Sequence, residues 1–278
     1  MEINESLVRR LIARQFPQWA GLPVRAAHPQ GHDNRTFRLG EDMAVRLPSA
    51  AGYVAHIPWE VFALTHLAPH LTVAIPQCLG QGAPDAEFPF PWTVNQWLPG
   101  ETVTHENVPD MQQLAADLGR FLRELHAAPV EGAPIAGAEN CYRGCHPSVY
   151  GAEVQQALTR LRNVIPTAEY ARIWQAGCAT CWTQPPVWVH GDVAVGNMLQ
   201  RQGRLSAVID FGTCGVGDPA CDYVMAWTFF DAPARQAFLA EADAQTIARA
   251  RAWAAWKALI TPDTPLSRHV LQAVLEDP

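Results

Sequence analysis

Short apolar runs separated by polar turns predict paired strands between residues 186 and 212. The run Val187–Val189 indicates a buried strand, because it is a short apolar run bounded by turn-forming residues. Two later runs, at 198–200 and 207–209, flank a polar turn at Gly203 and indicate a hairpin. The polar residues at the open end of this hairpin are therefore expected to lie close together.

The pattern along the rest of the chain changes from strand-rich to helix-rich near residue 98. Apolar spacing predicts helices over 4–16, 54–69, 107–127, 149–161 and 168–181, and further helices toward the C-terminus. Short strands are predicted within 23–47 and at 73–76, 77–79 and 92–97. The segment Leu98-Pro99-Gly100 interrupts the strand pattern, so we place a boundary between two parts of the chain after residue 97.

Three polar residues that border the predicted strands indicate phosphoryl transfer. Asn197 and Asp210 fall on the two strands at the open end of the hairpin, and Asp192 lies one loop away. Carboxylate and amide oxygens are ligands that Mg²⁺ prefers, and a further carboxylate can orient an acceptor hydroxyl and take its proton. The alternative is an ordinary surface hairpin with scattered polar residues. Three polar positions at this spacing, each bounded by a predicted strand, are hard to obtain by chance and argue against this alternative.

The order and spacing of these residues resemble those of the aminoglycoside phosphotransferase family, which includes the choline kinase relatives. The resemblance rests on His190-Gly191-Asp192, on Asn197 five residues after Asp192, and on Asp210-Phe211-Gly212. It implies that Asp192 is the catalytic base and that Asn197 and Asp210 bind the metal ion. The resemblance covers the whole chain in order, although only residues 187–222 carry the specific motif.

The same resemblance implies an α+β, protein-kinase-like fold with two lobes. The smaller lobe, residues 1–97, would hold an antiparallel sheet and bind the nucleotide. The larger lobe, residues 98–278, would be mainly helical and hold the catalytic and substrate-binding residues. Gly191 stands where protein kinases carry an arginine that holds a phosphorylated activation loop, and only residues 213–217 separate Gly212 from Asp218. These departures favour a permanently active small-molecule kinase over a protein kinase.

Nucleotide-binding residues are assigned by the same resemblance. The turn at 31–34, which ends at Asn34, would cover the phosphates. Arg46 on the third strand would hold them, and Glu60 on the following helix would pair with Arg46. Backbone atoms of Gln96 and Leu98, at the hinge between the lobes, are the candidate contacts to the base.

Arg46 departs from the lysine that kinases usually carry at this position. An arginine can hold phosphate oxygens through two N–H groups and is always charged. Either the site is built around Arg46, or the chain is catalytically impaired. The presence of Asp192, Asn197 and Asp210 together favours the first interpretation.

Composition narrows the classes of partner. The chain has 278 residues, with 17% charged and 49% hydrophobic residues, which indicates one or two globular domains. Its net charge of −7 argues against a nucleic-acid partner and would suit a cationic substrate. The amphipathic N-terminus and the lack of a long apolar run predict a cytoplasmic protein without a membrane-bound segment. The oligomeric state stays open.

Cysteine spacing raises the question of a zinc site. Cys141 and Cys145 form one closely spaced pair, and Cys178 and Cys181 form another. The first pair falls in a polar loop and the second near a helix end, so the pattern gives no reason for them to meet. We expect free or packed thiols.

The function expected from these observations is Mg²⁺-dependent transfer of the γ-phosphate of ATP or GTP to a hydroxyl of a small molecule. The family-typical acceptor is an aminoglycoside-type antibiotic, and Asp231, Glu241 and Asp243 are candidates to line the cleft of a cationic substrate. Other acceptors stay open: a macrolide, a choline-like amine or a sugar. A non-catalytic, nucleotide-binding pseudokinase is the alternative from another class, motivated by Arg46.

Overall fold

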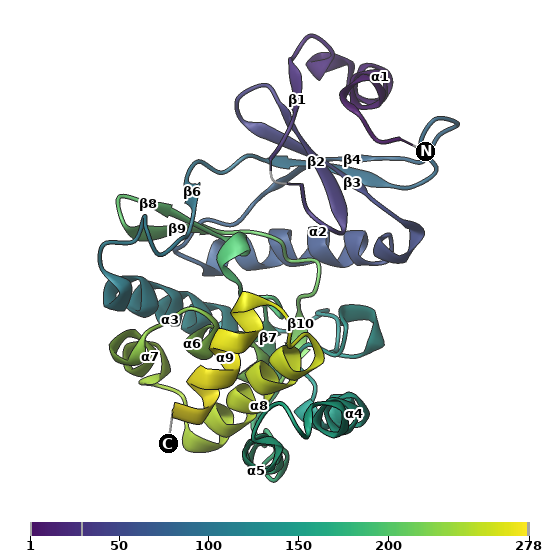
Figure 1. Ribbon diagram of the computed structural model, residues 1–278. Helices are drawn as coiled ribbons and strands as arrows, with labels where there is room; N and C mark the ends of the chain where they lie inside the picture. Colours follow the sequence, from purple (N-terminus) through teal and green to yellow (C-terminus); the bar gives the residue numbers. More distant parts are fainter. Residues whose placement is uncertain (1, 29, 277–278) are drawn as a thin grey trace.

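The computed structural model describes residues 2–28 and 30–276, which fold into two lobes (Figure 1). The small lobe holds an antiparallel sheet and is drawn in purple and blue at the top. The larger lobe, drawn in teal to yellow, is mainly helical. This architecture confirms the fold expected from the sequence. The boundary between residues 97 and 98 stays a prediction.

Within the described residues, the sheet of the small lobe has five strands in the order β1-β2-β3-β5-β4. Their bounds are β1 Val24–Ala26, β2 Asn34–Leu39, β3 Met43–Pro48, β4 Cys78–Gly82 and β5 Trp92–Gln96. Neighbouring strands are antiparallel, and Thr36 on β2 lies opposite Arg46 on β3. This register fixes the face of the sheet on which Arg46 lies, because side chains opposite each other on paired strands share a face.

Two helices of the first 70 residues pack on different partners. Helix α1, Glu5–Gln15, buries Leu7 and Leu11 in the same hydrophobic cluster as the sheet strands, as its apolar stripe predicted. Helix α2, His56–Leu67, instead contributes Leu64 to the hydrophobic cluster of the larger lobe. It lies between the sheet and the helices below (Figure 1). A polar residue of α2 can therefore reach the space between the lobes.

The larger lobe is built around helix α8. Its long helices are α3 Met111–Ala127, α4 Gly151–Leu161, α5 Thr167–Cys178, α7 Ala232–Leu239, α8 Ala244–Ile260 and α9 Pro265–Glu276, with the short α6 at Met225–Thr228. Helix α8 packs against α4, α5 and α9, and Trp253 and Trp256 on it are buried. Most of its length is therefore buried inside the lobe.

Short strands of the larger lobe carry the motif region. Their bounds are β6 Glu101–Thr102, β7 Val187–Val189, β8 Met198–Arg201, β9 Arg204–Val208 and β10 Gly215–Gly217. Strands β8 and β9 form the expected hairpin, closed by Gln202 and Gly203, which both have positive φ as two-residue hairpin turns require. β6 extends this hairpin, and β7 pairs with β10.

One predicted strand and one helix start are wrong. Residues 73–76 form no strand, because only Ala74 bridges to Ala207 and Pro76 has no N–H to extend a ladder. The helix expected from residue 107 begins at Met111. Asp110 caps it by accepting a hydrogen bond of 2.9 Å from the Gln113 N–H, and Pro109 precedes the cap.

Candidate active site

The hairpin brings Asn197 and Asp210 to neighbouring strand ends, as the sequence predicted. A single 3₁₀ turn, Val195–Asn197, leads into β8, and the Ile209 N–H donates to the Asn197 carbonyl at 2.9 Å. Asp210 follows with φ of 67°, a left-handed conformation that is uncommon for residues other than glycine. Strained backbone of this kind is concentrated at functional sites.

Asp192 and Asn197 are joined directly. The Asn197 Nδ2 group donates to the Asp192 carboxylate oxygen Oδ2 at 3.0 Å and to the Asp192 carbonyl at 2.9 Å. With both contacts on its nitrogen, the amide oxygen of Asn197 remains available to a cation. The side chain of Asp192 is exposed, so it can meet a molecule that enters from solvent.

Arg46 connects the two lobes at this point. Its guanidinium donates to the carboxylate of Glu60 on α2, and its Nη2 donates to Asp210 Oδ1 at 2.9 Å. Glu60 and Arg46 are largely buried, whereas the side chain of Asp210 is 44% exposed. Burial opposes the charge of Arg46, but Glu60 and Asp210 outweigh this effect and raise its pKa. The pairing of Arg46 with Glu60 that the sequence suggested is present.

The charge of Asp210 is held in place by this contact. Burial alone would raise the pKa of Asp210, but the charge and hydrogen bond of Arg46 lower it below its usual value. Asp210 therefore carries a negative charge at neutral pH. It presents one oxygen to Arg46 and leaves the other for a further cation.

His190 and Asp222 hold the loop that carries Asp192. The carboxylate of buried Asp222 accepts from the N–H groups of His190 at 2.9 Å and of Gly191 at 2.8 Å. The Asp192 N–H approaches His190 Nδ1 at 3.2 Å, and His190 Nε2 lies 3.1 Å from the Ile209 carbonyl. This pattern assigns the proton to Nε2, which ties the loop to the strand that leads to Asp210.

Only glycine fits at position 191. Gly191 has φ of +82°, and a Cβ added there would lie 2.6 Å from the Thr213 carbonyl oxygen and 2.7 Å from the Arg143 Cβ. The absence of an arginine at this position, noted in the sequence, thus has a steric reason. The space that a side chain would need is filled by residues 143 and 213.

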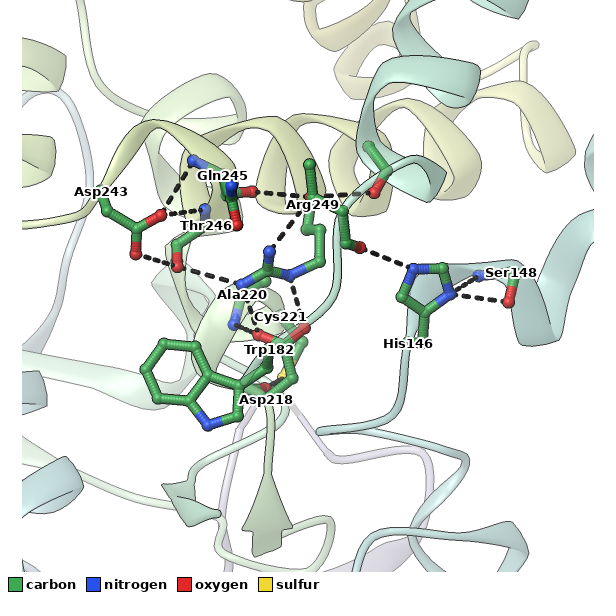
Figure 2. A network of polar contacts seen from close by, with 12 residues as sticks. His146, Ser148, Trp182, Asp218, Ala220, Cys221, Asp243, Gln245, Thr246 and Arg249 are labelled. Carbon is green, nitrogen blue, oxygen red and sulfur yellow. Dashed lines mark hydrogen bonds and ion pairs between the residues drawn. The ribbon is translucent and has the colours of Figure 1, made fainter. Parts of the chain in front are cut away.

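A buried ion pair between Arg249 and Asp218 holds the segment that leads to Asp222, and Figure 2 shows the hydrogen bonds around this pair. The Arg249 Nε donates to Asp218 Oδ2 at 2.6 Å, and both side chains are almost fully buried. Thr246 and Thr180 accept further hydrogen bonds from the same guanidinium, each at 3.1 Å. Asp218 also caps the following 3₁₀ turn by accepting from the Ala220 N–H at 3.0 Å. This network fixes the position of the loop-bracing Asp222.

A cavity of about 500 Å³ opens beside Asp192. Its walls are mostly apolar and come from the loop after β6, the Asp192 loop and helices α6, α8 and α9. Aliphatic and aromatic side chains form much of the lining, among them Val195, Val224, Phe229, Trp256 and Leu266. An acceptor that occupied this cavity would meet Asp192 at the cavity wall.

The remaining nucleotide-site candidates lie at the small lobe and hinge. Asn34 opens β2 opposite Pro48, two residues before Thr36, so it lies on the face of the sheet that carries Arg46. The Gln96 N–H is already bonded to the Gln77 carbonyl at 2.7 Å, which leaves only its carbonyl for a base contact. No partner for the Leu98 N–H is found among residues 2–28 and 30–276.

Comparison with known protein families assigns the chain to one of them. The phosphotransferase enzyme family matches residues 25–259, most of the chain. The chain belongs to this family. Aminoglycoside 3'-phosphotransferase of Escherichia coli is 26% identical to this family member over 154 residues, which cover 49% of this chain and 51% of the relative. The matched region thus spans about half the length of the curated relatives.

Solved structures share the fold of this phosphotransferase family member. A mutant of aminoglycoside 2'-phosphotransferase-IIIa in complex with GDP superposes with a TM-score of 0.74 at 22% identity, covering 99% of this chain and 97% of that one. A macrolide 2'-phosphotransferase from Brachybacterium faecium superposes with a TM-score of 0.63 at 23% identity, covering 99% and 98%. These similarities establish the kinase-like fold of the family for this chain.

The acids suggested for a cationic-substrate cleft lie elsewhere in this family member. Asp231 caps α7 and Asp243 caps α8, each by accepting backbone N–H hydrogen bonds. Glu241 pairs with Arg123 at 2.9 Å on the surface. None of the three lines the cavity beside Asp192. An aspartate before a helix is a common cap, and this signal could have separated Asp231 and Asp243 from cleft residues.

Two cationic residues of the cavity were missed in the sequence. Arg143 and Lys257 both line it, from the loop before α4 and from α8. Lys257 is the only lysine in the chain, a count that could have drawn attention to it.

Cys141, Cys145, Cys178 and Cys181 are free thiols, and no cluster of three or more His, Cys, Asp or Glu suited to a metal ion is found in the described residues. Across residues 2–28 and 30–276, no helix has the length and apolar character needed to cross a membrane.

Proposed function

We propose that this protein transfers the γ-phosphate of ATP or GTP to a hydroxyl of a small molecule, with Mg²⁺ as cofactor. The observation that carries the proposal is the contact of Arg46 with Asp210, at 2.9 Å. It joins Arg46 of the small lobe, which would bind phosphate, to Asp210 of the larger lobe, which would bind the metal ion. Asp192 and Asn197, linked at 3.0 Å, lie on the loop that precedes the same hairpin.

The donor set fits Mg²⁺. Asp210 offers a carboxylate oxygen and Asn197 an amide oxygen, and both are hard ligands at the open end of one hairpin. When bound, Mg²⁺ neutralises charge on the β- and γ-phosphates. Arg46 would share that task from the other side, positioned by Glu60.

Asp192 would act on the acceptor. Its exposed carboxylate, held by the Asn197 amide, would orient the hydroxyl and accept its proton as the oxygen–phosphorus bond forms. The bond between the γ-phosphorus and the bridging oxygen breaks, and the nucleoside diphosphate leaves. Positioning and charge neutralisation would supply most of the catalysis.

The base would bind at the hinge. The carbonyl of Gln96 and the N–H of Leu98 would serve as acceptor and donor, and Asn34, on the face of the sheet that carries Arg46, would cover the phosphates. These roles, and the division into lobes at residues 97 and 98, belong to the proposal. A cytoplasmic location, where nucleotide and Mg²⁺ are present, is also part of the proposal.

Two acceptor classes come first. Aminoglycoside-type antibiotics are supported by the names of the curated relatives. Macrolides are the second class, because the cavity beside Asp192 has mostly apolar walls. A pseudokinase role is disfavoured, since Arg46 occupies its place in a complete ion-pair arrangement.

The test is release of nucleoside diphosphate by the purified protein with ATP or GTP, across aminoglycosides, macrolides and small amino alcohols. We expect at least one acceptor to stimulate release, the phosphate to be found on its hydroxyl by mass spectrometry, and the activity to vanish when Mg²⁺ is omitted. Nucleotide binding without phosphorylation of any alcohol would instead support the pseudokinase.

A further inference from the structure

The cavity beside Asp192 contains two positively charged side chains that form no ion pair in the described residues. The guanidinium of Arg143 and the ammonium of Lys257 form no ion pair or side-chain hydrogen bond with any residue in the described part of the chain. The Nε of Arg143 is buried and lacks a hydrogen-bond partner. In a protein of net charge −7, two unpaired cations at one cavity are an unusual arrangement.

Both cations lie over the same aromatic ring. The Arg143 Cζ is 5.3 Å from the ring centroid of Trp256, and the Lys257 Nζ is 5.7 Å from it. Tyr150 stacks on Trp256 with ring centroids 3.8 Å apart. The ring is therefore already in contact with two cations of the protein, and it does not offer an open aromatic cage to an ammonium group of a ligand.

The carboxylates of the cavity form no ion pair with these two cations in the described residues. Within the described residues, only Glu106 and the proposed base Asp192 contribute acidic groups to its lining. An acceptor with several ammonium groups would bring them toward Arg143 and Lys257, at a cost in electrostatic energy. An acceptor with an anionic group would relieve the repulsion between these two cations.

We infer that Arg143 and Lys257 form a subsite for an anionic group of the acceptor. The preferred acceptor is then an alcohol with an apolar body and one carboxylate or phosphate. Its body would pack on Val224 and Phe229, its anion would face the two cations, and its hydroxyl would face Asp192. This inference rests on the proposed phosphotransfer, and it favours an anionic acceptor over the two antibiotic classes considered first.

The test uses four alcohols with the same chain: terminal hydroxy-octanoate, its uncharged amide, the matching amino-octanol and octanediol monophosphate. We expect kcat/KM for the carboxylate or the phosphate to exceed that for the amine by about tenfold or more. Lys257→Gln and Arg143→Gln should bring the values together. Arg162→Gln, which removes an exposed arginine outside the cavity lining, should leave the preference unchanged. The anion that the subsite prefers is identified by which of the two substrates, the carboxylate or the phosphate, has the higher kcat/KM.

A second measurement does not depend on turnover. Because Lys257 is the only lysine, its acetylation by an amine-reactive ester can be followed by peptide mass spectrometry, with the α-amino group of the chain as internal reference. Hydroxy-octanoate should slow acetylation of Lys257 severalfold, and its uncharged amide, which does not consume the ester, should not.

The two readouts separate the inference from the proposed function. Turnover with some acceptor, but neither anion preference nor protection of Lys257, would overturn the subsite and leave phosphotransfer standing. Protection of Lys257 by the anion without phosphorylation of any alcohol would support the subsite and count against the proposed activity. Equal protection by the anion and the uncharged amide would overturn the subsite whatever the turnover.

Discussion

Arg46 and Asp210 are separated by 164 positions in the sequence, yet they are joined by a hydrogen-bonded ion pair of 2.9 Å. Arg46 belongs to the sheet of the small lobe, and Asp210 follows the hairpin of the larger lobe. Glu60 holds the same guanidinium from α2. The relative position of the lobes therefore decides whether the proposed phosphate-binding cation and the proposed metal ligand face each other.

Replacing Arg46 by lysine should weaken nucleotide binding. A lysine ammonium is a point charge, and it cannot hold Glu60 and Asp210 with two separate N–H groups in the planar geometry of a guanidinium. We expect Arg46→Lys to raise KM for the nucleotide about tenfold with a smaller loss in kcat, measured by diphosphate release. An unchanged KM would show that Arg46 does not hold phosphates. Arg25→Lys, on β1 of the same sheet, is the matched control.

Gly191→Ala should destabilise the protein. The positive φ and the 2.6 Å approach to the Thr213 carbonyl require movement of the Asp192 loop. We expect a loss of about 2 kcal/mol or more in the free energy of unfolding, measured with urea, and a lower kcat. Gly196→Ala on the same loop is the control for stability, because a Cβ there meets nothing within 4 Å. Equal effects of the two substitutions would refute the steric account.

The buried pair of Asp218 and Arg249 should be costly to break from one side. Asp218→Asn leaves the Arg249 charge in a site that is 1% exposed, so we expect a loss of about 3–5 kcal/mol in unfolding free energy. Adding Arg249→Met should recover part of it. Arg123→Ala removes only an exposed pair with Glu241 and should cost less than about 1 kcal/mol. A single substitution at Asp218 as mild as Arg123→Ala would contradict this account.

Asp117 on α3 should make stability depend on pH. Burial would raise its pKa, but the hydrogen bonds and charge of Arg204, at 2.7 Å from both carboxylate oxygens, lower it below its usual value. A lowered folded-state pKa stabilises the protein above the unfolded value of about 4, and this contribution is lost as pH falls through the folded pKa.

Urea unfolding of the wild type and Asp117→Asn between neutral and acidic pH checks this. The stability advantage of the wild type should be constant near neutral pH and shrink below about pH 4. An advantage that grows on acidification would have the opposite sign and exclude a lowered pKa for Asp117.

Local patterns were sufficient to predict the motif region. The apolar runs predicted β7 and the β8–β9 hairpin, and antiparallel pairing then placed Asn197 beside the end of β9, which Asp210 follows. The pairing of Arg46 with Glu60 followed from the family resemblance rather than from periodicity. Residues 73–76 show the limit of such patterns, because an apolar run forms a strand only where a neighbouring strand is free to pair with it.

The cavity beside Asp192 could not be predicted in this way. Arg143 and Lys257 are 114 positions apart, and only the packing of α8 against the loop before α4 brings them to one ring. Composition explains why Arg46 stands where kinases usually carry a lysine. The chain has 19 arginines and one lysine, so an arginine at position 46 agrees with its general usage and is no sign of lost activity.

The most direct test of the proposed activity compares wild type and Asp192→Asn in two assays, nucleotide affinity by calorimetry with Mg²⁺ present and transfer of the γ-phosphate to an acceptor in a single turnover. Asp192 does not contact Arg46 or Asp210 in the structure, so we expect similar nucleotide affinities. Transfer should fall by at least about a hundredfold, because the hydroxyl loses its base. Transfer at the wild-type rate by Asp192→Asn would contradict the assignment of the catalytic site.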